Sequence, residues 1–206
     1  KKGMPWVKIA DATESNSRFI STTKEFIKEE GVSRSVIVNK GDLILSNSGT
    51  AGLPKFMEIT ACIHDGWQTF TNLKGINKEF LYYTLINVRS KLLHNAYDST
   101  MKNLTLDMVK ELVINIPSNE TQKKIANILS TLDDKIELNH KMNQTLEDMA
   151  QALFKSWFVD FEPVHAKVNA KSDDDFDQIV EELGVSREIL DLFPDEFEES
   201  ELGMIP

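Results

Sequence analysis

The 206-residue sequence has a single cysteine, Cys62, and no apolar run of the roughly 18 residues that a membrane-spanning helix needs. A single cysteine excludes a disulfide framework and any metal site built from several cysteines. The first ten residues also lack the charged, apolar and small regions of a signal peptide. We therefore expect a cytoplasmic protein without a membrane partner.

Catalytic motifs are also missing. Residues 49–52 (GTAG) are too short for a phosphate-binding loop and are not followed by Lys-Ser or Lys-Thr. No methyltransferase motif of the NPPY type occurs, and residues 133–135 (DDK), which match part of a nuclease motif, are interpreted as a solvated helix face. The four histidines are too scattered to share a metal ion: His64, His94, His140 and His165. The sequence thus predicts no catalytic site, no metal site and no cofactor bound by this chain.

Negative charge is unevenly distributed along the chain. The formal net charge of −10 by itself argues against nucleic acid, because Lys and Arg side chains must neutralise phosphates. Residues 1–118 nevertheless have a balance of +3, whereas residues 173–201 hold 13 acidic side chains and one basic side chain. The acidity therefore belongs to the C-terminal region, and the first 118 residues remain compatible with DNA.

Short apolar and β-branched runs, separated by turns with Gly, Pro and Asp, fill the chain between Trp6 and Leu73. This pattern is typical of a small sheet with irregular loops. Asn77 suits the N-cap of a helix over residues 79–97, and a short helix over residues 106–112, capped by Thr105, precedes a strand-like segment. The predicted fold class is α+β, beginning with a small mixed α/β domain over residues 1–118.

A long helix is predicted next. Asn119, with Gln122 three residues later, fits a capping box, and neither Gly nor Pro occurs from there to Pro163. This helix would have about 40 residues and a length of roughly 60 Å. Seam positions recur at alternating steps of four and three, as in a coiled coil: Ile125, Leu129, Leu132, Ile136, Asn139, Asn143, Leu146, Ala150, Leu153 and Trp157. An amphipathic helix lying on its own domain remains the alternative.

Two amides, Asn139 and Asn143, lie in successive layers of this seam, where an unpaired amide is costly. If two antiparallel copies are centred on residue 141, Asn139 faces Asn143 of the other copy and Leu129 faces Leu153. A shift by one heptad instead places both amides against aliphatic side chains. The sequence therefore predicts an antiparallel homodimer in this register.

Several stretches resemble the specificity subunits of type I restriction-modification enzymes. The long helix with its flanks, residues 116–164, is similar to the family's helical spacer and includes KIELNHKMNQTLEDMAQALFKSWFVDF. GMPWVKIAD (3–11), GDLILSNSGTAGLPKF (41–56), CIHDGW (62–67) and STMKNLTLDMVKELVINIP (99–117) resemble the family's target recognition domain, in the same order. LFPDEFEESELGMIP (192–206) resembles the linker that leads into a second recognition domain.

The resemblance implies three segments: a target recognition domain over residues 1–118, a coiled-coil spacer helix over residues 119–162, and an acidic linker over residues 163–206. The family subunit usually contains two recognition domains and two spacer helices, so this chain resembles its N-terminal half, either as a truncated piece or as a natural half-subunit. The two helices of the intact subunit pack antiparallel, and two half-length copies can reproduce that packing by dimerising. A symmetric dimer implies a palindromic target.

The resemblance also implies a non-catalytic function in recognising DNA sequence. The expected partners are double-stranded DNA, modification (methyltransferase) subunits and restriction/translocase subunits. S-adenosylmethionine and ATP with Mg²⁺ are expected in those subunits and not in this chain. A widened apolar face is expected to dock the modification subunits through Met142, Met149, Phe154 and Phe158. The alternative is an acidic coiled-coil scaffold that binds protein and no DNA.

DNA recognition requires donors and acceptors for base edges and positive charge for phosphates. The candidates are polar residues of two loops and basic residues of the first domain: Arg18, Lys24, Ser46, Asn47, Ser48, Thr50, Lys55, Ser99, Thr100, Lys102 and Asn103. For each of them, turn chemistry or a solvated charge is an equally good explanation. Trp67 is expected in the core and not as a platform for base stacking.

Overall fold

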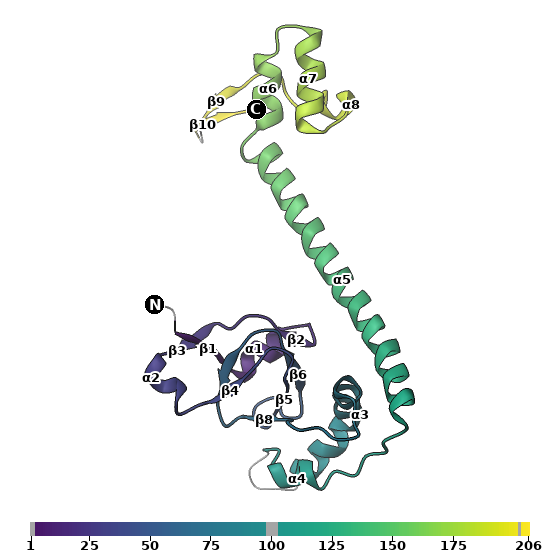
Figure 1. The fold of residues 1–206 in the computed structure, drawn as a ribbon. Coiled ribbons are helices and arrows are strands. Elements are labelled where there is room, and N and C mark those ends of the chain that lie inside the picture. The colour runs from purple at the N-terminus through teal and green to yellow at the C-terminus, as the bar shows by residue number, and fades with distance from the viewer. Residues whose placement is uncertain (1–2, 98–102, 202) are drawn as a thin grey trace. The chain divides into compact units, whose positions relative to one another are not determined.

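The computed structural model describes residues 3–97, 103–201 and 203–206. The chain divides into two compact units, the first ending at Leu138 and the second beginning at Asn139. Figure 1 shows the order of the helices and strands, which confirms the predicted α+β class. In the part of the chain that the structure describes, no helix is long and apolar enough to cross a membrane.

Eight strands of the first unit form two sheets among the described residues: β1 (Met4–Val7), β2 (Phe19–Ile20), β3 (Glu25–Ile27), β4 (Val36–Val38), β5 (Leu43–Ser46), β6 (Pro54–Met57), β7 (Ala61–Ile63) and β8 (Trp67–Thr69). One sheet has the order β3-β1-β7-β4, with β1 parallel to β7 and the other pairs antiparallel. The other has the order β2-β6-β5-β8, with β2 parallel to β6 and the other pairs antiparallel. The short runs of the sequence therefore form mixed sheets.

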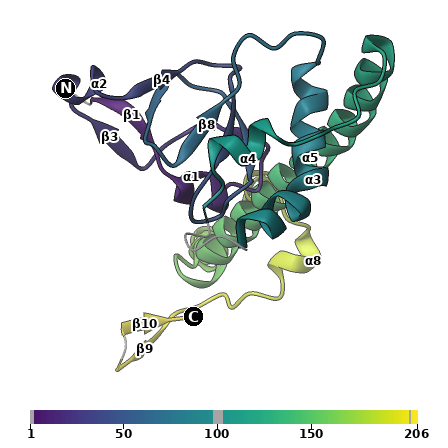
Figure 2. The ribbon, with the colours of Figure 1, turned by 90° about the horizontal axis from the view of Figure 1, so that it is seen from below.

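The sheet β2-β6-β5-β8 is buried on both faces. Alternation along β5 directs Leu43 and Leu45 to one face and Ile44 to the other. Leu43 and Leu45 pack with Leu81 and Leu85 of α3 (Lys78–Tyr97), whereas Ile44 packs in a cluster with residues of the other sheet. The sheet thus lies between α3 on one side and the β3-β1-β7-β4 sheet on the other (Figure 1, Figure 2).

Three short helices complete the first domain: α1 (Ile9–Glu14), α2 (Glu29–Val32) and α4 (Leu106–Lys110). Thr105 caps α4 as predicted, because its Oγ1 accepts the backbone N–H of Met108 at 3.3 Å, and the helix ends two residues earlier than expected. The strand-like segment, residues 112–116, forms no strand in the structure. It connects α4 to the next helix, and Val113 within it is exposed.

Helix α5 (Asn119–Phe158) has the predicted length of 40 residues. The predicted capping box at its start is wrong: Ser118 Oγ accepts the backbone N–H of Thr121, and Gln122 is buried against the first domain. The helix ends four residues before the predicted end of the spacer. Phe161, whose φ is 51°, then separates it from α6 (Glu162–Asn169).

Residues 163–206, expected as an acidic linker, contain regular structure in the second unit: most of α6, α7 (Asp173–Leu183), α8 (Arg187–Leu190), β9 (Glu198–Ser200) and β10 (Gly203–Ile205). Ser172 and Asp175 form a capping box at the start of α7. Val164 and Leu190 are buried, whereas most of the acidic side chains remain at the surface. Sparse apolar residues are therefore sufficient to give this acidic segment a small core.

Candidate nucleic-acid interface

A groove of about 680 Å³ brings together the two loops in which the sequence places base-reading residues. One wall follows directly after β5, the floor is β8 with the turn before it, and the other wall is the start of α4. We call it the loop groove, and its lining residues are Asn47, Ser48, Asp65, Gly66, Trp67, Gln68, Thr69, Asn103, Leu104, Thr105 and Leu106. The groove presents amide, hydroxyl and carboxylate groups, which are the groups that recognise base edges.

Backbone hydrogen bonds hold these loops together. The N–H of Leu104 donates to the Asn47 carbonyl at 2.8 Å, and the Asn47 N–H donates to the Gly66 carbonyl at 2.8 Å. Gln68 Nε2 donates to the Leu104 carbonyl at 2.9 Å, which ties β8 to the same wall. A Cβ added at Gly66 would lie 2.2 Å from a ring atom of His64, so the His64 side chain would have to move. The groove is thus built on a fixed frame.

Three of the predicted DNA-contacting residues line the loop groove: Asn47, Ser48 and Asn103. Thr50 is half-buried in the same loop as Ser48, and Lys24 is exposed and paired with Glu14 at 2.5 Å. Ser99, Thr100 and Lys102 lie outside the described residues. Trp67 is buried, and its Nε1 donates to the Val7 carbonyl, in agreement with its predicted place in the core.

Ser46 and Lys55 are corrections to the predicted set, because both are buried. The Ser46 hydroxyl donates to the Thr50 carbonyl at 2.5 Å and accepts the N–H of Leu53 at 2.9 Å, so it shapes the turn between β5 and β6. Lys55 is 5% exposed, and its Nζ donates to the carbonyls of Ser15 and Ser17. Burial lowers the pKa of Lys55. Neither side chain can reach a phosphate in this conformation.

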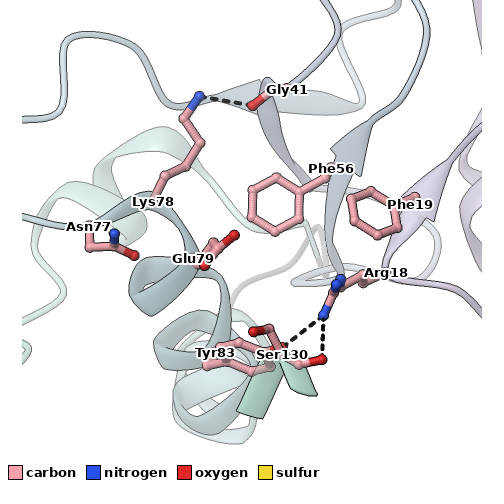
Figure 3. A pocket seen from close by; sticks show the side chains of 9 residues that line it. All are labelled: Arg18, Phe19, Gly41, Phe56, Asn77, Lys78, Glu79, Tyr83 and Ser130. Carbon is pink, nitrogen blue, oxygen red and sulfur yellow. Dashed lines mark hydrogen bonds between the residues drawn. The ribbon is translucent and has the colours of Figure 1, made fainter. Parts of the chain in front are cut away.

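Arg18 is also a correction, because its side chain is 12% exposed and turned toward α5. Its guanidinium donates to the Ser130 carbonyl at 3.1 Å and to the Tyr83 hydroxyl at 3.3 Å (Figure 3). It also forms an ion pair with Asp134. The backbone N–H of Arg18 donates to a Glu137 carboxylate oxygen at 3.4 Å. We call these residues, with Asp133, the Arg18 cluster.

Asp133 and Tyr83 extend this cluster. The Tyr83 hydroxyl donates to Asp133 Oδ2 at 2.8 Å, and Asp133 lies 3.9 Å from the Arg18 guanidinium. Burial and the hydrogen bond to Asp133 raise the pKa of Tyr83. The sequence suggests that Asp133 belongs to a solvated helix face, but in the structure it contacts Tyr83 and Arg18. Sequence reasoning missed this cluster, whose only signal is the spacing of residues 130, 133, 134 and 137 on one side of a helix.

A cavity of about 460 Å³ lies next to the Arg18 cluster, between β2, β6 and α3 (Figure 3). Phe19 and Phe56 form one side of it, and the Arg18 guanidinium lies 4.9 Å from the centre of the Phe19 ring. Lys78, at the opposite side, donates to the Gly41 carbonyl at 2.8 Å. Arg18 and Lys78, the two basic side chains that line this cavity, thus both donate hydrogen bonds to acceptors of the protein itself.

The apolar seam of α5 is covered at its start and exposed further on. Ile125 and Leu129 are half-buried and line a cavity with α3 side chains, as in the alternative of a helix lying on its own domain. Leu132 and Ile136 are 55% and 52% exposed. The later positions are also exposed, apart from Trp157, which is half-buried and packs on Phe193: Asn139, Asn143, Leu146, Leu153 and the expected docking residues Met142, Met149, Phe154 and Phe158.

Comparison with known proteins identifies related sequences. The family model described as "Type I restriction modification DNA specificity domain" matches residues 1–148. The chain is 52% identical over 106 residues to the type I restriction enzyme HindI specificity subunit of Haemophilus influenzae, which is 50% of this chain and 23% of that protein. It is 33% identical over 164 residues to the MjaIX specificity subunit of Methanocaldococcus jannaschii, which is 78% of this chain and 38% of that protein.

A solved structure has a similar fold. The structure described as "Structural basis underlying complex assembly and conformational transition of the type I R-M system" contains a chain that aligns with a TM-score of 0.51 at 16% identity. The alignment covers 76% of this chain and 37% of the other. The chain therefore matches well under half of the length of each of these relatives.

Proposed function

Because the chain belongs to the family of type I restriction modification DNA specificity domains, we propose that it reads one half of a bipartite DNA target. The observation that carries this proposal is the loop groove, in which Asn103 lies together with Asn47 and Ser48 although it is more than fifty residues away from them in the sequence. Amide and hydroxyl groups of this kind recognise adenine and other base edges in the major groove. The family match favours this function over an acidic scaffold that binds no DNA.

Asp65 adds a group that the sequence analysis did not select. Its carboxylate is fully exposed at the edge of the loop groove, 3.6 Å from the His64 ring nitrogen. A carboxylate accepts the amino group of cytosine but repels phosphate. Asp65 therefore suits the contact with a base edge and not with the DNA backbone. In the sequence, Asp65-Gly66 carries only the signal of a turn.

The exposed part of α5 supports two further parts of the proposal. One is an antiparallel homodimer centred on residue 141, in which the exposed Leu132 and Leu146 become covered. The other is docking of modification subunits on Met142, Met149, Phe154 and Phe158. Exposed apolar side chains in such a continuous row are typical of a surface that another protein covers. The restriction/translocase subunits would join the same complex.

The chain itself acts without catalysis in this proposal. S-adenosylmethionine would be bound by the modification subunits, and ATP with Mg²⁺ by the restriction/translocase subunits. Among the described residues, no group of three His, Cys, Asp or Glu side chains is arranged to hold a metal ion. The residues of the chain would contribute only the choice of DNA sequence and the distance between the two half-sites.

The proposal can be tested by expressing the full chain together with its modification subunit and sequencing the methylated DNA. We expect adenine methylation at one bipartite site, and a palindromic site if two copies of the chain act together. The control is the same modification subunit without the chain. An identical methylation pattern with and without the chain would contradict the proposed function.

A further inference from the structure

A polar stripe on α5 attaches the helix to the recognition domain beyond the point where the seam residues Ile125 and Leu129 lie against α3. Ser130, Asp133, Asp134 and Glu137 are spaced so that they share one side of the helix, and all four contact the Arg18 region or Tyr83. Beside this stripe, the seam residues Leu132 and Ile136 stay exposed. The helix can therefore be held by its own domain and still offer its seam to another helix.

A second attachment lies at the start of the same stripe. Gln122 is 1% exposed, and its Oε1 accepts the backbone N–H of Asn77 at 2.7 Å. Its Nε2 donates to the carbonyls of Gly75 and Pro117 at 3.1 and 2.9 Å. Gln122 and Asp134 are separated by 12 residues, or about 18 Å along the helix. Two points of attachment along the helix axis fix the direction of α5, whereas the helix could rotate about a single point.

We propose that Arg18 is a positioning residue that fixes the direction of α5 relative to the recognition domain and thereby sets the number of unread bases between the two half-sites. Its planar guanidinium donates at the same time to α3, through Tyr83, and to α5, through Ser130 and Asp134. A lysine has no such fork of donors and could not make these contacts together. This inference rests on the proposed function, because it concerns the geometry of the same DNA complex.

The length of the helix beyond the cluster explains why its direction matters. Glu137 and Phe158, the last helical residue, are 21 residues apart, or about 31 Å. A rotation of about 10° at the cluster would displace the far end of this segment by about 5 Å. Successive base pairs are about 3.4 Å apart. A small change of direction therefore corresponds to more than one base pair of spacing.

The charges of the Arg18 cluster are suited to this role. One guanidinium faces three carboxylates, Asp133, Asp134 and Glu137, and Lys55 is buried nearby. The Asp134 side chain is 62% exposed, so its ion pair with Arg18 contributes little net stability, because water weakens the attraction. What the ion pairs provide is a strong preference for one geometry, since each displaced charge loses its partner. Asp134→Asn, which neutralises only this exposed carboxylate, should therefore change geometry more than folding.

The first test measures the direction of α5 in the full chain. Spin labels are placed on cysteines at two exposed positions, Lys40→Cys and Gln151→Cys, in a chain with Cys62→Ala, and the labelled chain is diluted with unlabelled chain. We expect Arg18→Lys and Asp134→Asn to broaden the distance distribution or move its maximum. Lys124→Ala, which removes an exposed ion pair on the same helix, is the matched control and should change nothing. An unchanged distribution in both cluster variants would overturn the proposal.

The second test measures spacing. The complex with modification subunits selects targets from random duplex DNA, and the gap between half-sites is scored. We expect Arg18→Ala and Asp134→Asn to accept gaps one base pair longer or shorter about tenfold more often than the unmodified chain, while Lys124→Ala does not. If Arg18→Ala weakens binding equally at every gap and Asp134→Asn does not, Arg18 contacts phosphate and the inference is wrong. If the unmodified complex selects no DNA, the proposed function fails, and the spin-label distances still decide whether Arg18 directs α5.

Discussion

The side chain of Gln122 accepts the backbone N–H of Asn77 at 2.7 Å, directly at the start of α3. Asn77 Oδ1 in turn accepts the N–H of Phe80 at 2.9 Å and caps the helix. One glutamine of α5 therefore completes the N-terminus of α3. This relationship links α3 and α5, which are separated in the sequence by the segment that contains α4.

Replacing this glutamine should destabilise the protein. Gln122→Ala leaves the N–H of Asn77 and the carbonyls of Gly75 and Pro117 without their buried partner, so we expect a loss of about 2–3 kcal/mol in the free energy of unfolding. Urea unfolding followed by circular dichroism measures it. Gln151→Ala, an exposed glutamine of the same helix, is the control and should change stability by less than about 0.5 kcal/mol. Equal effects of the two substitutions would contradict this account.

Tyr82 should make stability depend on pH in the alkaline range. Burial, with the nearby Asp133, raises its pKa from 10 to about 12. Between these values the folded state keeps a proton that the unfolded state has lost, so this group's contribution falls as the pH rises. We expect the stability of the unmodified chain, relative to Tyr82→Phe, to fall by about 1 kcal/mol between pH 9 and pH 11. Urea unfolding at both pH values measures the difference, and parallel pH profiles would disprove the prediction.

The loop groove should tolerate the loss of its polar groups structurally but not functionally. Ser48→Ala and Asn103→Ala should each weaken binding to the DNA sequence that the methylation experiment identifies. We expect a loss of about 1–3 kcal/mol, because each substitution removes a group available to base edges. Fluorescence anisotropy at fixed salt measures this affinity. Ser33→Ala, an exposed serine outside the groove, is the control. If both groove variants bind like Ser33→Ala, the bases are read elsewhere.

The antiparallel register predicts one pattern of cross-links. In a chain with Cys62→Ala, a mixture of Leu132→Cys and Ala150→Cys chains should form disulfides between chains, because these exposed positions face each other when the pair is centred on residue 141. Leu132→Cys alone should not, since two copies of position 132 would be about 27 Å apart. Non-reducing electrophoresis distinguishes the outcomes. Efficient linkage of Leu132→Cys to itself would indicate a parallel pair instead.

The exposed aromatic side chains near the end of α5 should be needed for subunit docking. Phe154 and Phe158 lie 5.3 Å apart between ring centres, and both are exposed. Phe154→Asp places a charge in this surface and should reduce co-purification of the modification subunit about tenfold or more. Lys141→Asp, an exposed position on the side of α5 opposite the apolar seam, should leave co-purification unchanged. The same yield for both variants would show that docking uses another surface.

The sequence predicted local structure well where one pattern dominates. The absence of Gly and Pro and the periodic seam predicted a helix of about 40 residues, and α5 has 40. Thr105 was identified as the cap of α4, because a threonine followed by an apolar periodic run has few other interpretations. Wrong assignments arose where a local signal competes with a long-range partner. Gln122 fits a capping box, but three backbone groups of the first domain and its junction engage it instead.

The basic residues show the same limit. Arg18 and Lys55 are of the residue types that contact phosphates in DNA complexes. Whether such a cation faces solvent depends on the segments that pack around it. Arg18 is covered by α5, more than a hundred residues later, and Lys55 is enclosed by the carbonyls of Ser15 and Ser17. No pattern within a short window contains these partners. Residue type therefore predicted the presence of charge, and not its accessibility.

By itself, the sequence determined the α+β class, the length of α5, the family resemblance and the two loops that carry polar residues, because each of these depends on residues close together in the chain. Only the tertiary structure decided that the two loops meet in one groove across β8, and that Arg18 and Gln122 hold α5 by a polar stripe. The physical reason is that hydrogen bonds and ion pairs between distant segments act over a few ångströms. Such contacts exist only after the sheets and α3 have packed and brought those segments together.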